Sequence, residues 1–474
     1  MRENARVTDA VHSASRVETL DTADGRNDRI PLQTIWAYCL PLLGVGFTGM
    51  LFSIYLMKFS TDVLFVAPGA MGIVFGIGRI WDAISDPVAG YLSDRSTARR
   101  GRRRSWMFAS AIPIAATTVM VWSPPPLFQG LLLVGWLALA LIIYETAMTA
   151  FFVPHGALGM ELTSEYHERT RLFAYRHVIM AAGSGLGLGG VYLLRTSDDP
   201  RLMALMVSAA GGAALAAMIF YAAAKLPERP EHQGRGAVNV YSAFSDVFRN
   251  PHGRLLLIVY GIETFGAASI GMLAPYIMQY IVKAPELTEV FILMYFVPQF
   301  ALTPIWVAVS RRVGKKKLWI FSMCTLTLGY GSLFFVSTGS YALLFGVVFI
   351  LGLGGGCGHV VAPSIQADVI DYDDYLTGER KEGAYLAIWN MVRKAAAGVT
   401  AIFTGLVLQW VGYEPDAVQS ESTQLAIRAL MGLLPASCYA IGTLLFLRFN
   451  LNEAEHAQIV NELEVRRRAA KARD

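Results

Sequence analysis

Twelve apolar segments, each long enough to cross a membrane as a helix, constrain the fold of this chain more than any other feature. They lie at residues 32–60, 67–92, 105–124, 128–153, 171–194, 202–225, 254–282, 288–309, 316–337, 341–367, 383–411 and 425–449. A helix of about 20 apolar residues spans a hydrocarbon core of roughly 30 Å. Only 16% of the residues are charged, against about 25% in an ordinary soluble domain. The sequence therefore predicts an all-α, multi-pass membrane protein.

Basic residues gather in two connections between these segments. Residues 94–104, after the second segment, and residues 311–317, after the eighth, are rich in Arg and Lys. The connections after the first, third and ninth segments contain no Lys or Arg beyond Lys58. Cytoplasmic loops carry an excess of Lys and Arg, so both basic connections are predicted to be cytoplasmic. Because twelve spans return the chain to its starting side, we expect both termini to be cytoplasmic as well.

The two basic connections also mark an internal repeat, because each follows the second segment of a six-segment half. We predict six-helix bundles at residues 31–225 and 254–450, joined by a cytoplasmic linker at 226–253 that contains proline and glycine. Residues 1–30 are expected to form a disordered cytoplasmic tail, and residues 451–474 a charged cytoplasmic tail. This arrangement resembles the major facilitator fold, in which two bundles rock about a site near the membrane midplane.

Three ionisable residues lie inside the second apolar segment. Arg79, Asp82 and Asp86 fall within roughly 60° of one another on a helix, with Ser85 close by. Each such group costs about 2.5–3.5 kcal/mol at the bilayer centre, so its presence there indicates function. The alternative is an Arg–Asp pair that only holds helices together. One basic and two acidic groups leave an excess carboxylate, which is what a Na⁺ or H⁺ site requires.

The sequence around these residues resembles a known family. The stretch RIWDAISDPVAG at 79–90, with the basic connection after it, resembles the signature of the glycoside–pentoside–hexuronide:cation symporters, the melibiose permease family. The stretches VPHGAL at 153–158 and ADVIDY at 367–372 resemble further motifs of this family. The matches cover both halves of the chain. The resemblance implies a cation-coupled transporter in a bacterial inner membrane.

The resemblance also implies which residues bind the coupling cation. Matched motif by motif, the positions are Asp82, Ser85, Asp86 and Thr149. Asp82 and Asp86 would be the metal ligands if the ion is Na⁺. Melibiose permease has an amide where this chain has Ser85, so the choice between Na⁺ and H⁺ stays open. Apart from this ion, no cofactor is expected.

The substrate is expected to contact three charged residues, Lys394, Glu145 and Arg79. Lys394 corresponds to a functional lysine of the family's eleventh helix, and its depth in the segment favours the central cavity over the membrane surface. Glu145, one helical turn before Thr149, is either a substrate or proton group or a partner for Arg79.

The galactoside-binding acids of melibiose permease are missing, because their positions correspond to Gly46 and Phe152 here. We therefore expect symport of a small organic solute (a sugar, glycoside or uronate), with Lys394 contacting a negative group of an anionic or zwitterionic substrate. The family's animal relatives carry lysophospholipids, so a lysophospholipid or other amphipathic anion is the alternative substrate. A membrane receptor that binds without transport is the alternative from another class of protein.

The remaining expectations concern gating, enzyme activity and partners. Asp94 and Arg95 are predicted to meet Asp371 in a cytoplasmic gate when the carrier faces outward. The chain contains no nucleophile elbow, no HExxH and no His/Cys set at metal-ligand spacing, so an enzyme is not predicted. The expected partners are the lipid bilayer and a small-molecule substrate, without nucleic acid, and we expect a monomer.

Overall fold

The computed structural model describes residues 29–98, 100–163, 166–228, 247–378, 382–451 and 453–471. These residues contain helices and no β-strand, in agreement with the predicted all-α fold. Most of the predicted tail at 1–30 and of the predicted linker at 226–253 lies outside the described residues.

The helices follow the predicted apolar segments closely. The elements of the N-terminal half are α2 (Leu32–Met50), η1 (Leu51–Tyr55), α3 (Leu56–Lys58), η2 (Phe59–Val63), α4 (Pro68–Asp94), α5 (Arg102–Trp122), α6 (Gly130–Glu161), α7 (Tyr166–Thr196) and α8 (Pro200–Lys225). Those of the C-terminal half are α10 (Pro251–Tyr276), η4 (Ile277–Val282), η5 (Pro285–Leu287), α11 (Thr288–Ala301), α12 (Thr303–Val313), α13 (Lys315–Leu333), α14 (Tyr341–Thr377), α15 (Glu382–Trp410), α16 (Glu421–Arg428), η6 (Ala429–Leu433), α17 (Leu434–Phe446) and α18 (Glu453–Lys471).

Local sequence explains where several helices begin. Pro68 opens α4 at the first helical position, where its missing N–H leaves no hydrogen bond unmade. Asp199 caps α8 by accepting a hydrogen bond from the Leu202 N–H, at 3.0 Å. Asn250 caps α10 in the same way. These caps satisfy amide groups that a helix start otherwise leaves unpaired.

In the described part of the chain, nine helices are long and apolar enough to cross a membrane. The run from η5 through α12 qualifies as a tenth if it is one span bent by 43°. Pro298 and Pro304 flank this bend, and proline removes a backbone donor from a helix. The helices α4 and α13 are less apolar because of the charges in α4 and the three lysines that open α13. All twelve predicted segments fall in helices, and the number that cross the membrane stays a prediction.

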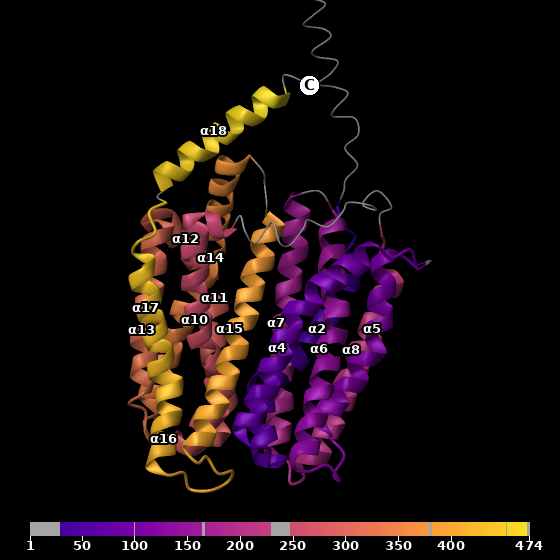
Figure 1. Ribbon diagram of the computed structural model, residues 1–474, viewed down its shortest axis with the longest axis vertical. Coiled ribbons are helices and arrows are strands. Elements are labelled where there is room, and N and C mark those ends of the chain that lie inside the picture. Colours follow the sequence, from indigo (N-terminus) through magenta and orange to yellow (C-terminus); the bar gives the residue numbers. More distant parts are fainter. Residues whose placement is uncertain are drawn as a thin grey trace, which may run out of the picture.

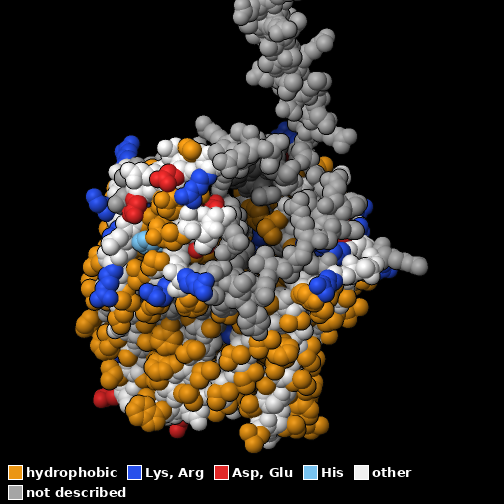
Figure 2. All heavy atoms as spheres, turned by 45° about the horizontal axis from the view of Figure 1, so that its top comes forward, with side chains coloured by type: hydrophobic (Ala, Val, Ile, Leu, Met, Phe, Trp, Pro, Cys, Tyr) orange, Lys and Arg blue, Asp and Glu red, His pale blue; other side chains and the backbone are white. Residues whose placement is uncertain are grey.

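The two halves form separate bundles that stand side by side (Figure 1). We call the end where α2 begins and α18 lies the near end, and the end where α4 begins the far end. Figure 2 shows a hollow between the bundles at the near end, with basic side chains at its rim. By the positive-inside rule the near end is expected to face the cytoplasm.

The predicted charged tail contains a helix, which lies over the near end of the C-terminal bundle. In this helix, α18, Ile459 and Leu463 are buried four residues apart, as an amphipathic helix requires. His456 approaches the Asp371 carboxylate of α14 to 3.2 Å.

Glycine residues let α4 and α15 run side by side across the boundary between the bundles. A Cβ atom added at Gly72 would lie 2.6 Å from the Ala401 carbonyl oxygen, and one at Gly405 would lie 2.3 Å from that of Pro68. Small residues allow such close backbone contact between helices in membranes. We call this contact, of Gly72 with Ala401 and of Gly405 with Pro68, the glycine seam. It joins the far halves of the two helices.

We expect Gly405→Ala to destabilise the arrangement in which the far end is closed. The added methyl group meets backbone at Pro68, and overpacking of this kind costs about 1–3 kcal/mol. The measurement is alkylation of Ile54→Cys by a membrane-impermeant maleimide, in a background without the native cysteines. Ile54 is buried where the bundles meet, so opening of the far end should accelerate its labelling.

The matched control is Gly189→Ala, because a Cβ at Gly189 meets no atom within 4 Å. Equal labelling of Ile54→Cys in both glycine variants would contradict the proposed role of the seam.

Candidate ion and substrate site

Asp82 and Asp86 of α4 face Thr149 of α6 inside the N-terminal bundle. The Thr149 hydroxyl lies 2.9 Å from Asp86 Oδ1 and 3.4 Å from Asp82 Oδ1. Ser85 Oγ lies 3.3 Å from the same hydroxyl. Asp82, Ser85 and Thr149 are all buried. The structure therefore brings together the four residues that the family resemblance named as cation ligands.

Lys394 enters this group of oxygens from the other bundle. Its Nζ atom lies 3.1 Å from Asp82 Oδ2 and also donates a hydrogen bond to Asp86 Oδ2. Lys394 is on α15, so this contact crosses the boundary between the bundles at the inner end of the glycine seam. The ammonium group of Lys394 thus lies between the two carboxylates. A free cation bound to these carboxylates would need the same position.

Arg79 and Glu145 complete the charged cluster. Arg79 Nη1 lies 3.7 Å from Asp82 Oδ2 and 3.8 Å from Glu145 Oε1, so the guanidinium is shared between two carboxylates. With all groups ionised, three carboxylates and two cations leave one excess negative charge. That excess matches one monovalent cation.

The donor set restricts which metal would fit. It offers carboxylate and hydroxyl oxygens, which suit hard cations such as Na⁺. Among the described residues, no group of three His, Cys, Asp or Glu side chains is placed to hold a metal ion. The residues fit an alkali cation or a proton better than a transition metal.

Arg176 of α7 is a further positive charge, besides Arg79 and Lys394, that the sequence analysis missed. Its guanidinium carbon lies 5.7 Å from the ring centre of Phe152 and 5.6 Å from that of Phe173. Phe152 follows Thr149 by three residues, so the ring that Arg176 contacts lies about one turn of α6 from Thr149. The signal was an arginine inside the fifth apolar segment.

No side chain fits at Gly46, where melibiose permease has an acid. A Cβ atom there would lie 2.2 Å from the Met180 carbonyl oxygen of α7. The close packing of α2 on α7 therefore explains this departure from the family pattern.

The gating residues are apart from this cluster. The guanidinium carbon of Arg95 lies 4.2 Å from the centre of the Tyr91 ring. Asp371 contacts His456 of α18. The side chain of Asp94 lies outside the described residues. Their predicted meeting in an outward-facing state stays a prediction.

A buried polar cluster at the far end was also missed. Asp62 pairs with Lys58 one turn before it, and accepts hydrogen bonds from the hydroxyl groups of Tyr280 at 3.0 Å and Tyr413 at 2.7 Å. Both tyrosines belong to the C-terminal half, so these bonds join the bundles. The only signal in the sequence was a Lys and an Asp four residues apart at the end of an apolar segment.

A salt bridge adds to this closure. Arg195 at the end of α7 lies 3.2 Å from Glu289 at the start of α11, again across the bundles. These contacts join the two bundles at the far end.

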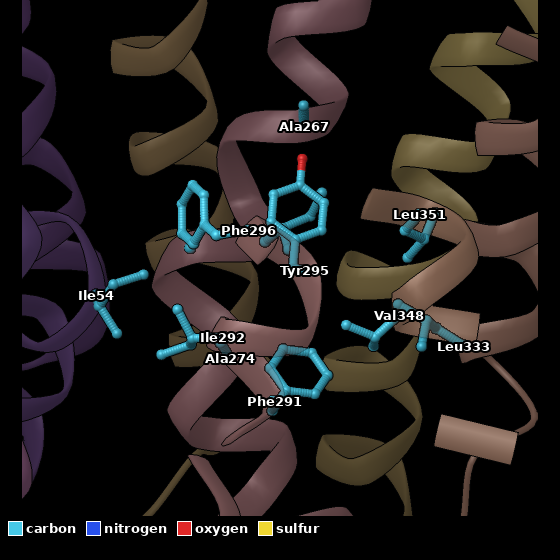
Figure 3. Close-up of a pocket in the computed structure, with 12 residues that line it drawn as sticks. Ile54, Ala267, Ala274, Phe291, Ile292, Tyr295, Phe296, Leu333, Val348 and Leu351 are labelled. Carbon is cyan, nitrogen blue, oxygen red and sulfur yellow. The ribbon is translucent and has the colours of Figure 1, made fainter. Parts of the chain in front are cut away.

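A small apolar cavity of about 130 Å³ lies between α10, α11 and α14, and Ile54 of the N-terminal bundle contributes to its wall (Figure 3). The Tyr295 hydroxyl lies beside α14, because a Cβ atom added at Gly355 would be 3.4 Å from its oxygen. Its lining carries no charged side chain, so the cavity is chemically distinct from the ion cluster.

The geometry agrees with comparisons to known proteins. A sequence profile of the family described as "MFS/sugar transport protein" matches residues 37–453. The chain belongs to this family. The match confirms the resemblance to glycoside–pentoside–hexuronide:cation symporters, and the protein is a multi-pass membrane transporter, not an enzyme.

Individual proteins similar to this chain are also transporters. The chain is 25% identical to the sodium-dependent lysophosphatidylcholine symporter 1-A of Danio rerio, over 89% of this chain and 86% of that protein. It is 22% identical to a glucuronide carrier protein homolog of Escherichia coli, over 93% and 97%. The crystal structure of a D-xylose–proton symporter aligns with a TM-score of 0.64 at 14% identity, covering 88% of this chain and 97% of that one. The last likeness establishes the fold.

We expect that removing one partner of the Lys58–Asp62 pair lowers the stability of the transporter more than removing both. Breaking a buried pair leaves an uncompensated charge, at a cost of about 3–5 kcal/mol, whereas replacing both partners is often nearly neutral. The variants are Lys58→Met, Asp62→Asn and the double variant, compared by apparent melting temperature in detergent. A double variant that melts at the sum of the two single losses would contradict this assignment.

Proposed function

We propose that this transporter is a symporter that couples Na⁺ or H⁺ to an anionic organic solute by alternating access. The observation that carries the proposal is the position of the Lys394 ammonium between Asp82 and Asp86. Two carboxylates inside a membrane-spanning bundle require a cation in every state, because unpaired charges in a membrane are costly. Lys394 supplies that cation in this state, and the coupling ion supplies it when Lys394 leaves.

Coupling follows from this exchange. When an ion replaces Lys394 at Asp82 and Asp86, the ammonium is left without its carboxylate partners. An anionic substrate group can then pair with it, so the ion and the substrate each favour binding of the other. Lys394 lies in one bundle and the carboxylates in the other, so the exchange also changes the contact on which rocking of the bundles depends.

An anionic substrate is supported by the charges near the cluster. Arg176 and Lys394 both offer positive charge, and the position of Gly46 has no room for the acid that melibiose permease uses. A uronate or other anionic sugar fits this chemistry, and one relative is a glucuronide carrier homolog. A lysophospholipid is the second candidate, favoured by the relative from Danio rerio that is a lysophosphatidylcholine symporter.

We expect Asp82→Asn and Asp86→Asn to abolish concentrative uptake, because each removes one ligand charge at nearly constant volume. The measurement is uptake into proteoliposomes under imposed Na⁺ and H⁺ gradients in turn, with methyl glucuronide, melibiose and lysophosphatidylcholine as probes. Counterflow without a gradient separates a carrier from a receptor that only binds. Unchanged concentrative uptake in both variants would overturn the ion site.

We further expect Lys394→Met to bind the coupling ion at least about tenfold more tightly than the native protein, because the ion no longer competes with an ammonium. The readout is ion-dependent thermal stabilisation, measured with Na⁺ at fixed pH and with H⁺ by varying pH. Weaker ion binding in Lys394→Met would mean that the lysine supports the ion instead of competing with it.

A further inference from the structure

Glu145 is the one carboxylate of the charged cluster that contacts neither Lys394 nor Thr149 in the described contacts. It lies on α6, and its side chain is 13% exposed. Its partner is Arg79, at 3.8 Å from Nη1 to Oε1. A buried acid at this position needs a reason, because an intramembrane carboxylate is costly.

The two cations of the cluster differ in how they can move. Arg79 stands three residues before Asp82 on the same helix, so it stays beside Asp82 through any movement of the bundles. Lys394 is on the opposite bundle and moves away when the bundles separate. If Arg79 formed a close ion pair with Asp82, the guanidinium would therefore permanently block a carboxylate that the coupling ion needs as a ligand.

The distances show that Arg79 does not form a hydrogen-bonded ion pair with Asp82. Its Nη1 atom is 3.7 Å from Asp82 Oδ2, beyond hydrogen-bond range, while Lys394 Nζ is 3.1 Å from the same oxygen. Glu145 Oε1 attracts the same Nη1 atom from nearly the same distance, 3.8 Å. Arg79 is thus held between two carboxylates, and Asp82 remains available to Lys394.

The spacing of α4 and α6 fixes this geometry within one bundle. Trp81 Nε1 donates a hydrogen bond to Thr146 Oγ1 at 2.7 Å, one residue from Glu145. Gly78 has no side chain between the helices, and a Cβ there would lie 4.0 Å from Glu145 Cγ. The pull of Glu145 on Arg79 therefore persists when the bundles rock, unlike any contact made by Lys394.

We propose that Glu145 is a positioning residue that holds the Arg79 guanidinium away from Asp82, so that Asp82 can exchange Lys394 for the coupling ion. This inference rests on the proposed function of the cluster. It assigns Glu145 a role through Arg79, in place of direct contact with the substrate or with the ion.

The test is a double-mutant cycle on ion affinity, with the full-length transporter in detergent. Ion binding is measured as thermal stabilisation by Na⁺ at fixed pH and by H⁺ over a range of pH, using whichever ion the native protein binds. The variants are Glu145→Gln, Glu145→Asp, Arg79→Gln and Arg79→Gln combined with Glu145→Gln. A cycle of this kind isolates the term that belongs to the pair.

We expect Glu145→Gln to weaken ion binding about tenfold relative to the native protein, which corresponds to about 1.4 kcal/mol. Glu145→Asp keeps the carboxylate, so it should retain most of the native ion affinity. In the Arg79→Gln background, Glu145→Gln should have little effect, since no guanidinium remains to be held. A direct electrostatic effect of Glu145 on the ion predicts the opposite, because without Arg79 its charge acts unneutralised.

Three results would overturn the inference: unchanged affinity in Glu145→Gln, no recovery in Glu145→Asp, or an equal or larger loss in the Arg79→Gln background. If Glu145→Gln does not fold, Glu145→Asp alone and combined with Arg79→Gln still tests the inference. The transporter with Glu145→Asp should then bind the ion slightly less well only when Arg79 is present. Absence of stabilisation by either ion in the native protein would instead refute the proposed function.

Discussion

The contact between the Lys394 ammonium and the carboxylates of Asp82 and Asp86 is the interaction on which the rest of the structure depends. It joins the bundles near the middle of α4 and α15. Because an unpaired charge inside a membrane-spanning helix is costly, neither the ammonium nor the carboxylates can be left without a partner. A carrier that rocks must break this contact, and it can do so only if another cation takes the vacated position. Coupling to an ion then follows from the positions of Lys394, Asp82 and Asp86, and it requires no further structural element.

The seam between α4 and α15 leads directly to this contact. From Pro68 and Gly405 inward, backbone packs on backbone, and the seam ends where the charged side chains begin. Beyond that point the near end is hollow (Figure 2). The far end is closed by a second polar contact, in which Asp62 accepts bonds from Tyr280 and Tyr413. The salt bridge between Arg195 and Glu289 adds to this closure. Opening the far end therefore requires that these polar contacts and the glycine seam separate together.

The sequence predicts much of this fold because the apolar segments and the basic connections are local signals. The charged stripe of α4 is visible for the same reason, since three ionisable residues in one apolar segment stand out. Partners from distant segments are not visible in this way. Nothing in the sequence around Lys58 and Asp62 indicates the tyrosines that bind them, because hydropathy reports the burial of a residue and not its neighbour. Arg176 stood out as an arginine inside an apolar segment, but its contact with Phe152 of α6 exists only in the tertiary structure. The helix α18 likewise packs on α14 only in the folded chain.

The most direct test of the account is a pair of experimental structures of the transporter, one saturated with the coupling ion and one in choline at a pH where carboxylates are ionised. The distance from Lys394 Nζ to the carboxylates of Asp82 and Asp86 is the quantity to compare. The account predicts contact in the ion-free structure, and separation beyond 4 Å, the limit for an ion pair, once the ion is bound between Asp82, Asp86 and Thr149. An ion-saturated structure in which Lys394 still pairs with both carboxylates would contradict it.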